Sequence, residues 1–280
     1  MKLFHNLLGL IFSFALMAVL LITSIEAVTY WTPGYYEKEY TKYQVLEAVD
    51  MEMDDLLEVT DEMMAYLRGD RKDLHVPTIV AGQPREFFNE REIAHMEDVR
   101  GLFLAAITIR RICFLVMAAC AALLIVLKAD TRRILPRMIC GGTILFFSIL
   151  ALLAGIISTD FSKYFILFHK IFFTNDLWIL DPSTDLLINI VPEPFFVDTA
   201  FRIAVTYGIS VIAVFSACVL WLKKQKKQKK RSSRASFSAC GGSPHQPNSL
   251  PTHGDPRGAF FCHRMHFPMT KSKEPETRFH

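Results

Sequence analysis

Residues 102–157 read LFLAAITIRRICFLVMAACAALLIVL, then KADTRRI, then LPRMICGGTILFFSILALLAGII, so that two apolar stretches flank a short polar link. Each apolar stretch is long enough for a helix to cross the ~30 Å hydrocarbon core of a bilayer at about 1.5 Å per residue. Lysine and arginine crowd the link, and such residues mark the cytoplasmic side of a membrane. The stretch therefore predicts a helical hairpin that crosses a membrane twice and turns in the cytoplasm.

Two more apolar stretches, Leu7 to Ile25 and Phe201 to Leu222, have the same character. The whole chain is 51% apolar and contains 23 phenylalanines, which is a composition typical of membrane proteins. We therefore expect an all-α, polytopic membrane protein with four transmembrane helices at about 7–25, 102–127, 135–157 and 201–222. A cleaved signal peptide is the alternative for the first stretch, but the apolar run is long for one and Ile25 stands where a small residue is needed.

The charges predict how the chain is oriented. Lys2 precedes the first span and the basic run Lys223 to Arg231 follows the fourth, which places both termini in the cytoplasm. Residues 30–100 contain 17 acidic and 8 basic residues, a net charge of −9, and we expect this loop and the loop 158–200 to be extracytoplasmic. The sequence thus divides into a membrane domain, 1–222, and a cytoplasmic tail, 223–280, whose basic start contacts anionic lipid and whose remainder is disordered.

The first outer loop begins with tyrosines from Tyr30 to Tyr43, which we interpret as an aromatic belt at the membrane interface. Apolar residues at helical spacing from Val45 to Leu67 predict one amphipathic helix, ended by Gly69. Residues 70–88 are interpreted as an irregular connector. Asn89 and Glu92 then form a capping-box pattern, so a new helix is expected to start there and to continue into the second span.

In the second outer loop, Ser158, Thr159 or Asp160 can cap a helix that runs through Phe161 to Phe173. This helix is too short and too polar to span, so we expect it to lie in the membrane interface or to dip back into the protein. Neither outer loop contains a cysteine, and no disulfide framework is predicted.

Two histidines carry the candidate chemistry. His95 and His169 each lie on a predicted helix at the membrane surface, and imidazoles can share acid and base duties near neutral pH. Asp98 lies three residues after His95, on the same helix face, where it can orient the imidazole. A metal site formed by these three residues is the rival interpretation. The chain lacks Gly-rich phosphate loops, a Gly-x-Ser-x-Gly elbow and a His-Glu-x-x-His motif.

These residues also carry a resemblance. His95-Met96-Glu97-Asp98-Val99, then Phe168-His169-Lys170-Ile171-Phe172-Phe173, then Trp178 and Pro192-Glu193-Pro194-Phe195-Phe196 resemble the lipoprotein intramolecular transacylase family of low-GC Gram-positive bacteria. The likeness extends from Met1 to about Leu222, in motif order and in the arrangement of the spans. The tail after Arg231 has no counterpart in it.

The resemblance implies a multi-pass acyltransferase of the cell membrane that acts on its extracytoplasmic side. The family moves the sn-2 acyl chain of the diacylglyceryl-cysteine of a lipoprotein to the free α-amino group, which gives a lyso-form lipoprotein. The expected partners are the diacylated lipoprotein and membrane lipid, with no nucleic acid, no metal and no cofactor. By position, the catalytic residues are His95 and His169. From their places in the chain, we expect Asp98, Asp176 and Trp178 to support them and Arg110 and Arg111 to contact substrate or head group.

We assign His169 as the base and His95 as the acid or oxyanion stabiliser. The alternative function is a non-enzymatic accessory or sensor protein whose acidic outer loop binds a partner. That hypothesis predicts that both histidines can be lost without consequence. A transporter is disfavoured, because the spans contain no internal repeat and few ionisable groups.

Overall fold

The computed structural model describes residues 1–240, with side chains up to residue 235. Residues Met1–Ser233 form one compact unit. The sequence-based expectations for the far tail, including its disorder, lie outside the described residues. The basic run after Leu222 is helical and continues the last long helix.

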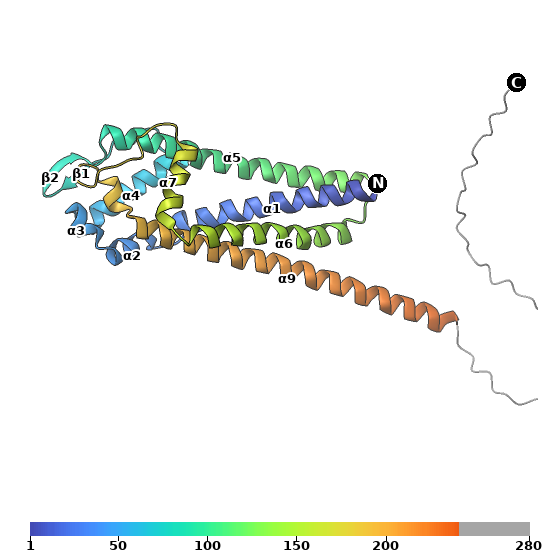
Figure 1. Cartoon of the computed structure of the whole chain (residues 1–280). Coiled ribbons are helices and arrows are strands. Elements are labelled where there is room, and N and C mark those ends of the chain that lie inside the picture. The colour runs from blue at the N-terminus through green and yellow to red at the C-terminus, as the bar shows by residue number, and fades with distance from the viewer. Residues whose placement is uncertain (241–280) are drawn as a thin grey trace, which may run out of the picture. The chain divides into compact units, whose positions relative to one another are not determined.

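Four long helices dominate the chain (Figure 1). They are α1 (Lys2–Tyr30), α5 (Glu90–Val126), α6 (Thr131–Ile157) and α9 (Glu193–Cys240). All four are long and apolar enough to cross a membrane, and they are the only such helices among the described residues. The four predicted spans fall within them, and the hairpin predicted from residues 102–157 is α5, a short turn and α6.

Helix α1 packs against both α5 and α6 and is the most buried of the four. Small residues allow α1 and α6 to approach closely, because a Cβ at Gly142 would lie 2.8 Å from the Cβ of Ser13. The hydroxyl of Ser13 donates a hydrogen bond to the carbonyl of Ile139 in α6 at 3.4 Å. Helix α9 contacts this group through Tyr207 and Val211, which pack with Met17.

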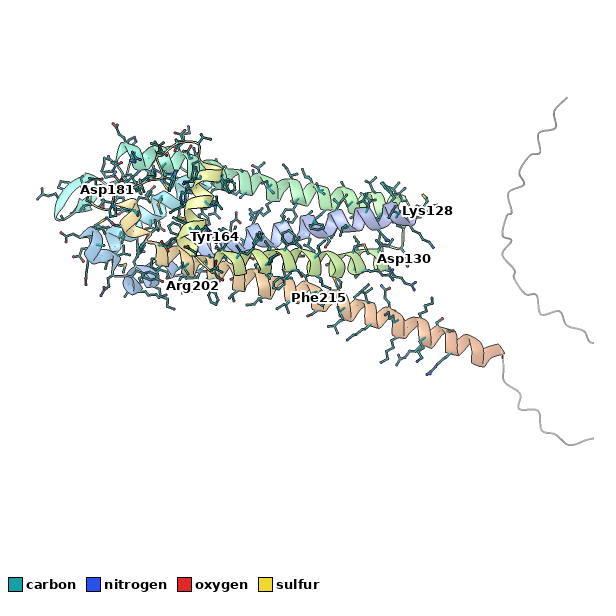
Figure 2. The ribbon with its side chains drawn as sticks, viewed as in Figure 1. Lys128, Asp130, Tyr164, Asp181, Arg202 and Phe215 are labelled. Carbon is teal, nitrogen blue, oxygen red and sulfur yellow. The ribbon has the colours of Figure 1, made fainter. Side chains whose placement is uncertain are left out.

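The segments between the long helices build a head at one end of the bundle (Figure 1). The head contains α2 (Tyr35–Lys42), α3 (Val45–Val49), α4 (Met53–Arg68), β1 (Pro77–Val80), β2 (Gln83–Glu86), α7 (Phe161–Phe172) and α8 (Leu187–Ile190). Its apolar core joins both loops, since Leu56 and Phe87 of the first loop are buried in one cluster with Leu187 and Ile190 of the second. Asp181 lies in the head, at the opposite end of the long helices from Lys128 and Asp130 (Figure 2).

Two local predictions in the first loop were wrong. The single amphipathic helix is divided into α3 and α4, because Asp50 has a left-handed backbone with φ of 53°. The irregular connector contains an antiparallel hairpin, β1–β2. Ala81 and Gly82 form its two-residue turn and both have positive φ, as primed hairpin turns require. The amide of Ala81 donates to the carbonyl of Asp50, so the hairpin fixes the break between the helices.

The tyrosine belt was also predicted incorrectly in part. Tyr35 and Tyr40 are buried in the head core, where Tyr40 donates to or accepts from Thr60 at 2.7 Å and both rings pack on Phe195. Trp31, in contrast, is exposed. Aromatic residues in this segment therefore build a folded core as well as an amphipathic surface.

Helix α7 crosses the long helices at the level where the bundle meets the head (Figure 1). Asp160 caps it by accepting a hydrogen bond from the amide of Lys163, as predicted. His169 is the only buried residue of its twelve. The outward face is apolar and exposed, and it comprises Ile166, Leu167, Phe168, Ile171 and Phe172.

Candidate active site

Helix α5 positions His95. The side chain of Asn89 accepts a hydrogen bond from the amide of Glu92, and the carboxylate of Glu92 accepts one from the amide of Asn89, so the predicted capping box is present. The helix then continues without a break into the membrane-spanning stretch. His95 lies two turns below the cap and is 7% exposed. A rigid element therefore sets the place of this imidazole.

Helix α7 positions His169 in its last turn. The side chain is 8% exposed, and its Nδ1 lies 2.7 Å from the carbonyl oxygen of Phe165. A carbonyl oxygen only accepts, so Nδ1 carries the proton of the neutral ring and Nε2 carries the lone pair. Nε2 of His169 is thus prepared to take up a proton.

The two histidines meet although they lie 74 positions apart in the sequence. Their ring centroids are 6.1 Å apart, with planes at 33° to one another. Phe173 packs against both, with its centroid 5.3 Å from His95 and 5.5 Å from His169. Phe165 and Trp178 lie on His169 at 4.4 and 5.0 Å. The pair can contact one substrate group within an aromatic enclosure.

Burial gives the two imidazoles different electrostatics. Desolvation by burial and, to a smaller extent, the neighbouring His169 lower the pKa of His95 from its usual 6.5 to about 4, and Asp98 partly opposes the shift. His95 is therefore neutral at physiological pH. Its Nδ1 is buried without a hydrogen-bond partner, which leaves Nε2 as the nitrogen that can meet a substrate.

Hydrogen bonds at the start of α5 hold the second loop in place. The carboxylate of Glu92, 1% exposed, accepts a hydrogen bond from the amide of Leu187 at 2.6 Å. The side-chain amide of Asn89 donates to the buried carboxylate of Asp185 at 2.8 Å. Burial raises the pKa of Glu92 although amides donate to it. Sequence analysis found Asn89 and Glu92 as a cap but missed this second role, because no local spacing signals a partner so far along the chain.

Asp98 does not hydrogen bond to His95, contrary to the prediction. Its carboxylate accepts a hydrogen bond from the side-chain amide of Asn175 at 2.9 Å. Asp176 approaches α5 through its backbone carbonyl, which accepts from the guanidinium of Arg91. Both supporting residues thus tie the segment after α7 to α5, and Trp178 of the same segment packs on His169.

The arginines predicted to contact substrate lie elsewhere. Arg110 forms an ion pair with Glu26 of α1, and Arg111 is exposed on α5. Arg110 follows His95 by fifteen positions, which corresponds to about 22 Å along a helix. The structure therefore assigns Arg110 to the α1–α5 contact and does not bring either arginine to the histidines.

The rival metal site is not assembled. Among the side chains that the structure describes, up to residue 235, no three histidine, cysteine, aspartate or glutamate residues lie together in a group that could hold a metal ion. Asp98 is engaged by Asn175, as described above.

The family model described as "Lipoprotein intramolecular transacylase Lit" matches residues 10–196 of this chain. The chain belongs to the lipoprotein intramolecular transacylase (Lit) family. The match includes both histidines and all of the head, and it ends at the fourth residue of α9. The chain is accordingly an acyltransferase that acts on lipoproteins.

Solved structures of Lit from Bacillus cereus share the fold. One is 24% identical, covers 81% of this chain and 100% of the Lit chain, and has a TM-score of 0.67. A second, of the same Lit with one histidine replaced by alanine, is 23% identical, covers 81% of this chain and 97% of its own, and has a TM-score of 0.66. Both are integral membrane proteins, in agreement with the four long apolar helices found here. No curated protein matches this chain.

Proposed function

We propose that this chain moves the sn-2 acyl chain of a diacylglyceryl-cysteine to the α-amino group of the same cysteine, with His95 and His169 as the catalytic pair. The observation that carries the proposal is the meeting of two buried imidazoles from separate loops, 6.1 Å apart, in an aromatic enclosure. The product is an N-acyl, S-monoacylglyceryl lipoprotein, the lyso-form.

The tautomer of His169 supports its role as the base. The α-amino group of the substrate has a pKa of about 7.7–8.0 and must be neutral to attack an ester. As the new C–N bond forms, Nε2 of His169 takes the proton from the amine. The same nitrogen then returns that proton to the glycerol oxygen as the C–O bond breaks. Amine and ester belong to one molecule, so holding them together replaces an acyl-enzyme intermediate.

His95 supports the developing negative charge. Because its pKa is held near 4, it is a neutral imidazole throughout, and a neutral Nε2–H can donate a hydrogen bond to the carbonyl oxygen of the tetrahedral intermediate. A buried donor of this kind does not need to reorganise during the reaction. The division of labour follows from burial and tautomer, without a metal or cofactor.

We place this site at the outer leaflet of the cell membrane. Helices α5, α7 and α9 all expose large apolar side chains, as expected of surfaces that face lipid. Lys163 and Lys170 are exposed on this same outward face of α7, beside Ile166 and Leu167, where their ammonium groups can extend to phosphate or water. The acidic head and the basic α5–α6 link lie at opposite ends of the long helices, which supports an extracytoplasmic head. Lipid acyl chains, including those of the substrate, would then cover α7.

Mass spectrometry of lipoprotein N-termini from cells that express variants tests this function. Replacing either histidine by Gln should reduce lyso-form product by a factor of at least about 100, in the usual range for loss of a general acid or base. The double variant should be little worse than either single variant, because the two side chains act as one unit. Full activity in both single variants would contradict the assignment.

A chelator separates this mechanism from metal catalysis. Both mechanisms lose activity in the histidine variants, so those variants alone do not discriminate. The purified enzyme should keep its activity after treatment with EDTA. Loss of activity that added metal restores would support a metal site instead.

A further inference from the structure

The segment that follows α7 forms one wall of the site. Phe173 lies against both imidazoles, and Trp178 packs on His169 with centroids 5.0 Å apart. Between them, Asn175 accepts a hydrogen bond from the amide of Leu177 at 3.1 Å, which makes a tight turn that carries Trp178 back to the imidazole. The position of this turn therefore determines how His169 is enclosed.

Helix α7 is held only lightly by its own packing. Only His169 of its twelve residues is buried, and its contacts with α9 lie towards the other end, where Phe165 packs on Phe196 at 5.1 Å and the hydroxyl of Ser162 donates to Glu193. The end of α7 that carries His169 thus depends on contacts made by the segment after it.

Asn175 supplies such a contact through its other side-chain atom. While its oxygen accepts from Leu177, its amide donates to the carboxylate of Asp98 at 2.9 Å. Asp98 lies one turn after His95 on α5, and the guanidinium of Arg91, one turn before His95, donates to the carbonyl of Asp176. The segment is therefore fastened to α5 on both sides of His95.

We propose that Asp98 and Asn175 are positioning residues that set the separation of the two imidazoles by fastening the end of α7 to the turn of α5 that bears His95. The proposal rests on the proposed roles of His95 and His169. Asp98 acts on His169 through Asn175 and Trp178, and its negative charge acts on His95 only at a distance. The contact needs one donor and one acceptor, one on α5 and the other on the turn, and the direction of the hydrogen bond is not itself important.

An exchange of the two side chains tests this. Asn175→Asp places two carboxylates in contact, and we expect the rate of lyso-form production from a synthetic diacylglyceryl-cysteine peptide to fall by about tenfold or more. Asp98→Asn alone leaves an amide oxygen to accept from Asn175, so it should cost about threefold or less. The double variant restores the hydrogen bond with its direction reversed, and the turn keeps an oxygen for Leu177. Its rate should return to within about threefold of the unaltered enzyme.

The opposite pattern would overturn the proposal. If Asp98 instead acts on His95 through its negative charge, Asp98→Asn will lower the rate more than Asn175→Asp does. The double variant will then be no faster than Asn175→Asp. An unchanged rate in Asn175→Asp would also contradict it. Asn175→Ala and Asp98→Ala provide a second test without added charge, in which each should lower the rate and the pair should be non-additive.

Two controls keep the outcomes distinguishable. Glu62→Gln removes an ion pair with Arg71 in the same head. Neither side chain is among the contacts described for His95 and His169, so the rate should be unchanged. His169→Gln measures the catalytic pair itself. If it retains activity, the proposed function fails, whereas its inactivity beside a fully active Asn175→Asp would contradict only the positioning proposal.

Discussion

At the scale of single residues, the two imidazoles differ in how their ring nitrogens are used. Nδ1 of His169 is engaged by the carbonyl of Phe165, which commits Nε2 to accept a proton. Nδ1 of His95 is enclosed without a partner, an arrangement that penalises protonation because the charged ring would bury an unpaired N–H. One ring is thus fitted to gain a proton and the other to remain neutral.

This difference predicts the pH dependence of the reaction. Between about pH 8 and 5 the rate should fall by at least about tenfold per pH unit, because the substrate amine becomes protonated below its pKa of ~7.7–8.0. His95 should add no loss of its own in this range, since its pKa is about 4. Initial rates on a lipopeptide, measured across this range, check the prediction. A second loss centred near pH 6.5 that His95→Gln abolishes would contradict it.

The same pKa has a consequence for stability. His95 binds a proton at about pH 6.5 in the unfolded chain but only near pH 4 in the folded chain, so the unfolded state binds more protons between these values. The neutral, folded form is favoured above pH 6.5, and this contribution is lost as the pH falls towards 4. It amounts to about 3 kcal/mol at most. In detergent, the Tm of the unaltered protein should fall more steeply between pH 6.5 and 4 than the Tm of His95→Gln. His75→Gln, at an exposed site, should follow the unaltered protein.

At the scale of elements, the contrast between α5 and α7 organises the site. Helix α5 is one unbroken element from the head into the bundle, whereas α7 is short and buries one side chain. The start of α5 was predictable because a capping box joins residues three apart. The bonds from Asn89 to Asp185 and from Leu187 to Glu92 were not, because nothing in local sequence links positions about 95 apart. Tertiary packing likewise buries Tyr35 and Tyr40, although their residue type alone is that of a membrane belt.

The close approach of α1 and α6 gives a test at the same scale. Gly142→Ala brings a Cβ against Ser13, so one helix must shift, and we expect the free energy of unfolding to fall by about 1–3 kcal/mol. Gly141 is the matched control because nothing lies within 4 Å of a Cβ added there. Gly141→Ala should be neutral or slightly stabilising, since alanine favours helix. Equal Tm values for the two variants in detergent would show that this helix contact is looser than described.

At the scale of the whole molecule, apolar length and segregated charge predicted the four spans, because these properties are written in contiguous sequence. The head was predicted only in outline. Its hairpin depends on the pairing of Ala81 with Asp50, and its core joins residues from both loops. The two histidines were found as single candidates, but their meeting depends on the fold as a whole.

The orientation of the molecule follows from the same charges and can be measured. Cysteines introduced at Glu58 and Ser183, both exposed in the head, should react in intact cells with a reagent that cannot cross the membrane. Asp185 is unsuitable for this purpose because it is buried and accepts a hydrogen bond from the side-chain amide of Asn89. The blank is the protein with the tail cysteines Cys240 and Cys262 replaced by serine, since the other four, Cys113, Cys120, Cys140 and Cys218, lie within the long apolar helices. A cysteine at Asp130, in the basic α5–α6 link, should react only after the cells are opened. Labelling of Asp130→Cys in intact cells would place the link outside, and the histidines would then face the cytoplasm, where a lipoprotein anchored in the outer leaflet cannot reach them.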